Sequence, residues 1–371
     1  MTKARDIASA TTPNANAALL ATFPHRNLII NGAMQASQRG DSTGKTATGY
    51  YGPDRYQLTL SSLGTWSISQ SSTVPSGFGN SYKLEATTAD ASPAASDYAI
   101  FLQKFEGQNL QQLKKGTASA ESVTLSFWVR SSKTGTYIVE LFDNDNSRSI
   151  SASYTISVAD TFEYKTITFA GDTTGAFDDD NASSLEVIWY LAAGSTYTSG
   201  TLQTSWGTRT SANQAVGQVN MADTANATWY ITGIQLELGS TATPFEHRSY
   251  GDELAACQRY YYEYSSASSG WLGLGNVYQT DQLICPVYSP TVMRALPTLT
   301  KTLDGSSQWL TTYDGFTGTN SNANTSLNSK GTSTIANSYI YITGTGRTGS
   351  DGQCHWLAIK TDAALHFDAE L

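Results

Sequence analysis

Between residues 27 and 248 the chain alternates short apolar stretches with polar breaks. The stretches include TWSISQ, SYKLEAT, YAIFLQKF, VTLSFWVR, TYIVELF, LEVIWYLA and WYITGIQLEL. In VTLSFWVR the apolar Val123, Leu125 and Phe127 alternate with small hydroxyl residues, a period of two that directs one face of a strand inward. The breaks are rich in Gly, Asn, Asp and Ser, which favour turns. Many short strands without helices between them predict an all-β fold, here a jelly-roll β-sandwich over residues 27–248.

Outside this region the pattern predicts three further parts. Residues 1–26 are small and polar without a clear period, which is typical of an extended attachment arm. Residues 249–264, SYGDELAACQRYYYEY, open with Ser249 three positions before Asp252, as at the start of a capped helix. We expect a short linking helix there. Residues 265–371 return to short apolar stretches and predict a smaller C-terminal β domain.

The composition narrows the classes of partner. Charged residues make up 14% of the chain, against roughly 25% in typical globular domains, whereas aromatic residues reach 11% with 21 Tyr and 8 Trp. The net charge is −9 and no basic stripe is visible, which argues against nucleic acid as a partner. No apolar run approaches the roughly 18 residues of a membrane span, so no membrane insertion is expected.

The sequence carries no recognisable catalytic motif, and we expect a protein that is not an enzyme. GDSTGKT at residues 40–46 is one residue too short between its glycines for a phosphate-binding loop, and no helical pattern follows it. The four histidines stand neither at metal-ligand spacing nor beside a nucleophile. Paired carboxylates for glycoside hydrolysis remain open, because they need proximity in space and not in sequence.

Two acidic clusters are the candidates for a metal. DNDN contains Asp143 and Asp145, and DDDN contains Asp178 and Asp180. Calcium prefers oxygen ligands of this kind, although the same residues also favour solvated β-turns. A structural calcium ion is therefore the one cofactor considered, and a turn is the alternative for each cluster.

Aromatic residues in polar surroundings are the candidates for carbohydrate contact. Trp206 lies in SGTLQTSWGTRTSANQ, and Trp309 lies in GSSQWLTTYDGF with Tyr313 nearby. An exposed ring in a loop can stack on the apolar face of a sugar. Trp128, Trp189 and Trp229 lie in strongly apolar strands instead, where we expect them to pack in the core or between sheets.

Several segments resemble tail-fibre-like virion proteins of phages and prophages. They are NLIING at 27–32 with QRG after it, GPDRY at 52–56, SFWVR at 126–130, WYITGIQLELGSTATPFEHRSYGDELAACQRYYYEY at 229–264, MRALPTLT at 293–300 and the closing FDAEL. NLIING, SFWVR and ITGIQLELG also resemble jelly-roll carbohydrate-binding modules. Those modules often hold a structural calcium ion near the first and last strands. Here Thr232 and Gly233 stand where an Asp is often found.

The resemblance implies a bacteriophage virion structural protein, located in the virion after assembly in the host bacterial cytoplasm. It implies a tail fibre or receptor-binding protein whose N-terminal arm attaches to a tail adaptor or baseplate. Such a protein would form a homo-oligomer, with a homotrimer the expected form, and would contact host surface polysaccharide. Two alternatives stay open: a head fibre or capsid decoration protein, and a polysaccharide-degrading tail spike.

Overall fold

The computed structural model describes residues 25–265, 270–279, 282–302, 310–314, 320–323, 326–329, 337–343, 354–359 and 362–371. The predicted arm lies outside the described residues except for its last two positions. The chain divides into two compact units between Glu253 and Leu254, with Leu371 in the first unit. In the described part of the chain no helix is long and apolar enough to cross a membrane.

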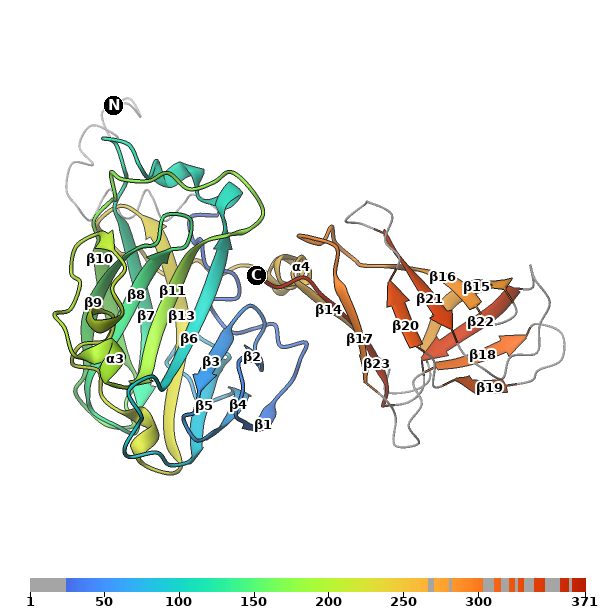
Figure 1. The fold of residues 1–371 in the computed structure, drawn as a ribbon, viewed down its shortest axis with the longest axis horizontal. Coiled ribbons are helices and arrows are strands. Elements are labelled where there is room, and N and C mark those ends of the chain that lie inside the picture. The colour runs from blue at the N-terminus through green and yellow to red at the C-terminus, as the bar shows by residue number, and fades with distance from the viewer. Residues whose placement is uncertain are drawn as a thin grey trace, which may run out of the picture. The chain divides into compact units, whose positions relative to one another are not determined.

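The first unit is built from two antiparallel sheets (Figure 1). Sheet A consists, in spatial order, of β1 (Ser42–Lys45), β4 (Thr65–Ser71), β5 (Ser81–Thr88), β13 (Ala227–Leu238), β7 (Val123–Ser131) and β10 (Glu163–Phe169). Sheet B consists of β12 (Gly207–Thr208), β9 (Arg148–Ile156), β8 (Gly135–Asp143), β11 (Ser183–Ala193), β6 (Tyr98–Glu106), β3 (Gln57–Ser61) and β2 (Gly49–Tyr50). Short helices join the strands: η1 (Gly107–Asn109), η2 (Gln111–Leu113), α3 (Ser195–Thr198), η3 (Ser211–Asn213) and η4 (Met221–Asp223). The predicted all-β sandwich is confirmed.

A single core fills the space between the two sheets. The alternation read from VTLSFWVR directs Val123, Leu125 and Phe127 of β7 into this core. On the facing sheet, Val187 and Trp189 of β11 are also fully buried in it. The alternation of apolar and polar residues therefore has the predicted result: each strand directs one face into the interior that the two sheets share.

Aromatic rings occupy the centre of the core, around Phe101 of β6. Its ring stacks on Tyr56 at a centroid distance of 4.8 Å and meets Tyr82 edge-on at 4.7 Å. Trp189 and Trp229 follow at 5.6 and 5.5 Å. Both tryptophans are fully buried, as the sequence predicted. Offset and edge-on ring pairs of this kind add stabilisation beyond their buried area. Trp128, for which burial was also expected, is only half-buried: it lies on the other face of β7 from Phe127, where its ring meets that of Tyr164 at 5.2 Å.

The NLIING segment lies against β13, so two segments far apart in the sequence are neighbours in the fold. The Asn27 side-chain amide donates to the Ile234 carbonyl at 3.0 Å, and its oxygen accepts from the Leu236 backbone N–H at 3.0 Å. Gly32 faces the same strand, where an added Cβ would lie 2.2 Å from the Ile234 carbonyl oxygen. Only glycine permits this close approach, which explains the closing residue of the segment.

Glu246 holds the start of the described chain, and this contact is expected to fail in acid. Its carboxylate accepts from the backbone N–H groups of His25 at 2.5 Å and Asn27 at 2.8 Å. Burial opposes the charge, but these hydrogen bonds and Arg248 outweigh it and lower the pKa of Glu246. A depressed folded-state pKa gives stability that is present above the unfolded value of about 4.3 and is lost as the pH falls through the folded value.

We therefore expect Glu246→Gln to be less stable than the native protein at neutral pH, with the difference shrinking as the pH falls below about 4.3 and vanishing once it has fallen through the folded-state pKa of Glu246. Urea unfolding measured across this pH range checks the prediction. Glu121→Gln, at a position whose side chain is 39% exposed, is the control. A difference for Glu246→Gln that persists unchanged into acid would contradict the proposed linkage.

The second unit is also made of antiparallel strands. Helix α4 (Tyr250–Gln258) and then strand β14 occupy the segment predicted as a linking helix. Sheet C consists of β14 (Tyr261–Ser265), β23 (Ala364–Asp368) and β17 (Thr298–Thr302). Sheet D consists of β19 (Asn320–Ala323), β18 (Leu310–Asp314), β22 (Cys354–Ile359), β15 (Gly270–Gln279), β16 (Gln282–Tyr288), β21 (Asn337–Thr343) and β20 (Ser326–Ser329). Leu365 and Phe367 of β23 are buried in the core of this unit.

Candidate functional site

Sheet B carries a second apolar cluster on the face turned away from the sandwich core. Neighbouring residues of β6 divide between the two sides, because Phe101 belongs to the main core and Ile100 to the second cluster. Residues 194–218, named the covering segment here, follow β11, and part of this segment lies over the outer face. Its residues Tyr197, Leu202 and Ala215 pack against the sheet. The outer face of sheet B is therefore partly closed by a surface segment.

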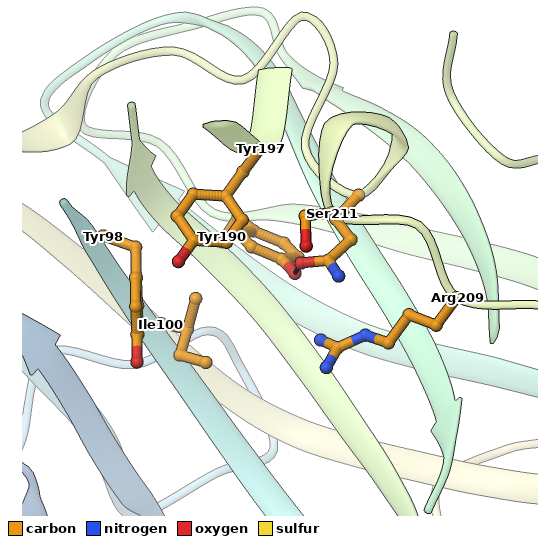
Figure 2. Close-up of a pocket in the computed structure, with 7 residues that line it drawn as sticks. Tyr98, Ile100, Tyr190, Tyr197, Arg209 and Ser211 are labelled. Carbon is orange, nitrogen blue, oxygen red and sulfur yellow. Dashed lines mark hydrogen bonds between the residues drawn. The ribbon is translucent and has the colours of Figure 1, made fainter. Parts of the chain in front are cut away.

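A cavity of about 200 Å³ lies where the covering segment meets sheet B (Figure 2). The described residues that line it are Tyr98, Ile100, Tyr190, Tyr197, Arg209, Ser211 and Gln214. Strands β6 and β11 supply the first three, and helix α3 and the chain around η3 supply the others. The rings of Tyr98 and Tyr197 meet edge to face at 5.3 Å on one side of the cavity. Both rings are half-buried, so part of each surface stays accessible.

A buried polar network forms the other side of the cavity. Nε and Nη2 of Arg209 donate to the two carboxylate oxygens of Glu140 at 3.0 and 2.8 Å. The Tyr190 hydroxyl lies 2.9 Å from the same carboxylate and 3.0 Å from Oε1 of Gln214. The Arg209 guanidinium also lies 4.0 Å from the ring centre of Phe142. These contacts fix the Arg209 side chain before any ligand arrives.

The charges of this network balance locally. Burial opposes the charge on Arg209, but the hydrogen bonds and charge of Glu140 outweigh it and raise the pKa of Arg209. The guanidinium thus stays charged and cancels a carboxylate that is itself fully buried. Nearby, burial raises the pKa of Glu186, with Lys104 and Arg209 acting against that rise. The cavity consequently presents hydrogen-bonding groups with little net charge.

The arrangement suits a ligand with both apolar faces and hydroxyl groups. The tyrosine rings offer flat apolar surface, and Arg209, Ser211 and Gln214 offer hydrogen-bonding groups around it. Among the described lining residues there is no carboxylate, because Glu140 lies fully buried beneath Arg209. The chemistry available at the cavity wall is recognition by stacking and hydrogen bonding.

The structure places the predicted carbohydrate contacts elsewhere. Trp206 was expected to be exposed, but it is half-buried: its indole N–H donates to the Ala170 carbonyl at 2.7 Å and its ring packs against the main core. The apolar ring lies against the end of the sandwich because more of its surface leaves water there. Trp309 lies outside the described residues. Tyr313 belongs to β18, where its backbone pairs with Trp356 of β22.

The acidic candidates separate into different local roles. Asp143 is buried and forms an ion pair with Lys115 at 2.5 Å. Asp145 accepts a hydrogen bond from the backbone N–H of Asp178 at 2.9 Å, so the two clusters do meet in space. Asp180 accepts from the backbone two residues later at 2.8 Å, as in a turn. Among the described residues no group of three or more His, Cys, Asp or Glu side chains converges as a metal site.

Sequence reasoning missed Tyr98, Tyr197 and Arg209. One signal was present, since Tyr197 and Arg209 flank Trp206 in one long polar stretch between two strands. Such stretches often carry binding residues. Tyr98 gave no signal, because it begins an ordinary apolar strand.

No protein-family model matches the chain, and no curated protein is similar enough to count as a relative. Among solved structures, the carbohydrate-binding module TmCBM61 in complex with β-1,4-galactotriose is 8% identical with a TM-score of 0.32, covering 58% of this chain and 99% of that one. The enzymatically active domain of tailspike protein 4 from bacteriophage CBA120 is 15% identical with a TM-score of 0.30. That match covers 58% of this chain but only 22% of the tailspike chain. A family 11 carbohydrate-binding module from Clostridium thermocellum is 13% identical with a TM-score of 0.26, covering 55% and 99%. Likenesses this remote carry no argument about the ligand.

Proposed function

We propose that this chain is a bacteriophage virion protein of the tail-fibre or receptor-binding kind that binds host surface glycans at the cavity on the outer face of sheet B. The observation that carries the glycan part is the pairing of two accessible tyrosine rings with a pre-oriented Arg209 in one cavity. The virion part rests on the sequence segments described above, among them NLIING and the run at 229–264.

The expected ligand is a neutral oligosaccharide. Since Glu140 compensates Arg209, the guanidinium supplies hydrogen bonds without adding net charge to the cavity. A pyranose ring has apolar C–H faces for Tyr98 and Tyr197 and equatorial hydroxyls for the polar wall. One such cavity would bind weakly alone, and several copies in a homotrimeric fibre would raise the overall affinity through multivalency.

Replacing Tyr197 with alanine is expected to weaken glycan binding at least about tenfold, equivalent to about 1.4 kcal/mol. The reason is the loss of one ring face while the sheet beneath it stays intact. Calorimetric titration with oligosaccharides prepared from the host surface polysaccharide measures the change. Tyr164→Ala, which removes an exposed ring from the opposite sheet, is the matched control. Equal affinities for native protein and Tyr197→Ala would rule this cavity out as the glycan site.

We further propose that the protein binds without cleaving, in contrast to a degrading tail spike. Two carboxylates near the cavity, Glu140 and Glu186, lie on adjacent strands β8 and β11 of the same sheet. The Glu140 carboxylate accepts hydrogen bonds from Arg209 and Tyr190, so it is not available to attack a sugar. Incubation with host polysaccharide should yield no new reducing ends. Steady release of oligosaccharide that Glu186→Gln abolishes would establish hydrolysis instead.

The position in the particle separates the tail-fibre proposal from a head fibre or capsid decoration protein. Gold-labelled antibodies against the second unit, applied to intact particles and viewed by electron microscopy, should decorate the tail. Decoration of the capsid faces would favour the alternative. Light scattering of the purified protein tests the homotrimer.

A further inference from the structure

A buried lysine at one end of the sandwich lies among oxygen atoms and beside two aromatic rings, those of Phe177 at 5.2 Å and Trp206 at 5.5 Å. Lys115 follows η2, and its side chain is 4% exposed. Its ammonium nitrogen lies 2.5 Å from Oδ2 of Asp143 and 3.1 Å from Oδ2 of Asp172. It also donates to the backbone carbonyls of Thr174 at 2.9 Å and Gly175 at 2.7 Å. These four oxygen atoms, which we name the oxygen cage, come from two separate stretches of chain, one at Asp143 and one over residues 172–175.

Each carboxylate of the oxygen cage is held in place by a further group. Arg148 donates to both oxygens of Asp172 at 2.7 and 3.0 Å. The Asn146 side chain donates to Oδ2 of Asp143 at 3.0 Å. Burial opposes the charge on Asp172, but Arg148 and Lys115 outweigh it and lower its pKa. The carboxylate oxygens are therefore positioned by partners other than Lys115, so we expect them to stay in place when the lysine is shortened.

The cage has the ligand set of a hard-cation site. Calcium sites combine carboxylate oxygens with backbone carbonyls and complete their six to eight ligands with water. Here two carboxylates and two successive carbonyls already converge on one positive charge. Lys115 also lines a surface cavity of about 360 Å³, through which water and ions would reach the cage if the side chain were shorter.

We propose that the oxygen cage is a cation site of the calcium type in which the ammonium group of Lys115 is the resident cation. The protein thereby carries its own cation at this end of the sandwich, and stability there does not depend on metal supply. When the lysine is shortened, the vacated position takes up Ca²⁺.

The experiment compares three variants in thermal unfolding with a chelator and with Ca²⁺. Lys115→Ser should lower the Tm in chelator and regain about 5 °C or more when Ca²⁺ reaches a hundredfold excess over its Kd. Lys115→Met removes the charge but keeps most of the volume, so it should be destabilised and gain nothing from Ca²⁺. Lys114→Ser, at an exposed neighbour paired with Glu121, should behave like the native protein. Mg²⁺ should replace Ca²⁺ poorly in Lys115→Ser, because it demands a stricter octahedral geometry.

Calorimetric titration with Ca²⁺ of Lys115→Ser and of the double variant Lys115→Ser/Asp143→Asn provides a second, direct measurement of calcium binding. The single variant should bind one Ca²⁺, and the double variant should lose that binding while remaining folded, because its buried charges are again balanced. A Lys115→Ser protein that stays unfolded in Ca²⁺, or that folds with a Tm indifferent to Ca²⁺, overturns the proposal. Equal calcium responses in native protein and Lys115→Ser would also overturn it.

Discussion

Arg209→Met is expected to destabilise the first unit by about 3–5 kcal/mol, because it leaves the fully buried Glu140 carboxylate without its partner. Methionine keeps most of the volume beside Phe142, so the loss reports the charge more than the packing. The same change should abolish glycan binding, since it removes the main donor from the cavity wall. Urea unfolding monitors the stability, and titration with the host oligosaccharides monitors binding.

The double variant Arg209→Met/Glu140→Gln separates the two effects of this change. Removing both charges should restore most of the stability, because no buried charge is left unpaired. Binding should stay lost, since the guanidinium is still missing. A double variant as unstable as Arg209→Met would mean that the loss arises from packing against Phe142. Recovery of binding would mean that Arg209 has no part in the cavity's function.

Phe101→Ala is expected to have an effect of similar size on stability alone, about 3–5 kcal/mol. Its ring touches four other aromatic rings at the centre of the core, and alanine would leave a void that these rigid neighbours cannot fill. The midpoint of urea unfolding measures the loss, which is a large fraction of the stability of a typical domain.

Two controls accompany the Phe101 measurement. Phe101→Leu retains much of the volume and should lose less. Tyr164→Ala removes a ring that is 45% exposed and should cost little. Equal losses for Phe101→Ala and Tyr164→Ala would show that the Phe101 cluster does not dominate the stability of the core.

The sandwich was predictable because the pattern that predicts each strand lies within a few neighbouring residues of the sequence. Alternation along β7 assigns Val123, Leu125 and Phe127 to one face without any knowledge of what that face meets. The burial of Trp189 and Trp229 follows from the same pattern. The pairing of NLIING with β13 was not predictable from periodicity, because it depends on an asparagine side chain that bridges residues over two hundred positions apart.

The cavity was not predictable, because its residues meet only after folding. Tyr98 begins β6, and Tyr197 and Arg209 come about a hundred positions later in the covering segment. The large ring of Trp206 in a polar stretch indicated a surface contact. In the structure the ring packs against the main core, and the indole N–H donates a hydrogen bond to the Ala170 carbonyl.

Lys115 illustrates a different limit of sequence reasoning. The acidic clusters indicated an oxygen-rich site around Asp143, and the structure supplies the missing cation from a lysine in another stretch of chain. The sequence near Asp143 does not predict Lys115 as its partner, because ion pairs between loops have no characteristic spacing in the sequence.

The covering segment has a consequence for how the protein can change. One wall of the cavity belongs to the central strands of sheet B, whose other side builds the core, so mutations there endanger folding. The opposite wall belongs to a single stretch between β11 and β13 that lies over the outer face of the sheet. Substitutions in that stretch that spare Arg209, which pairs with buried Glu140, and Trp206, which packs against the core, can alter ligand preference at little risk to the scaffold. Under the proposed function, adaptive variation in ligand preference is expected to concentrate between residues 194 and 218.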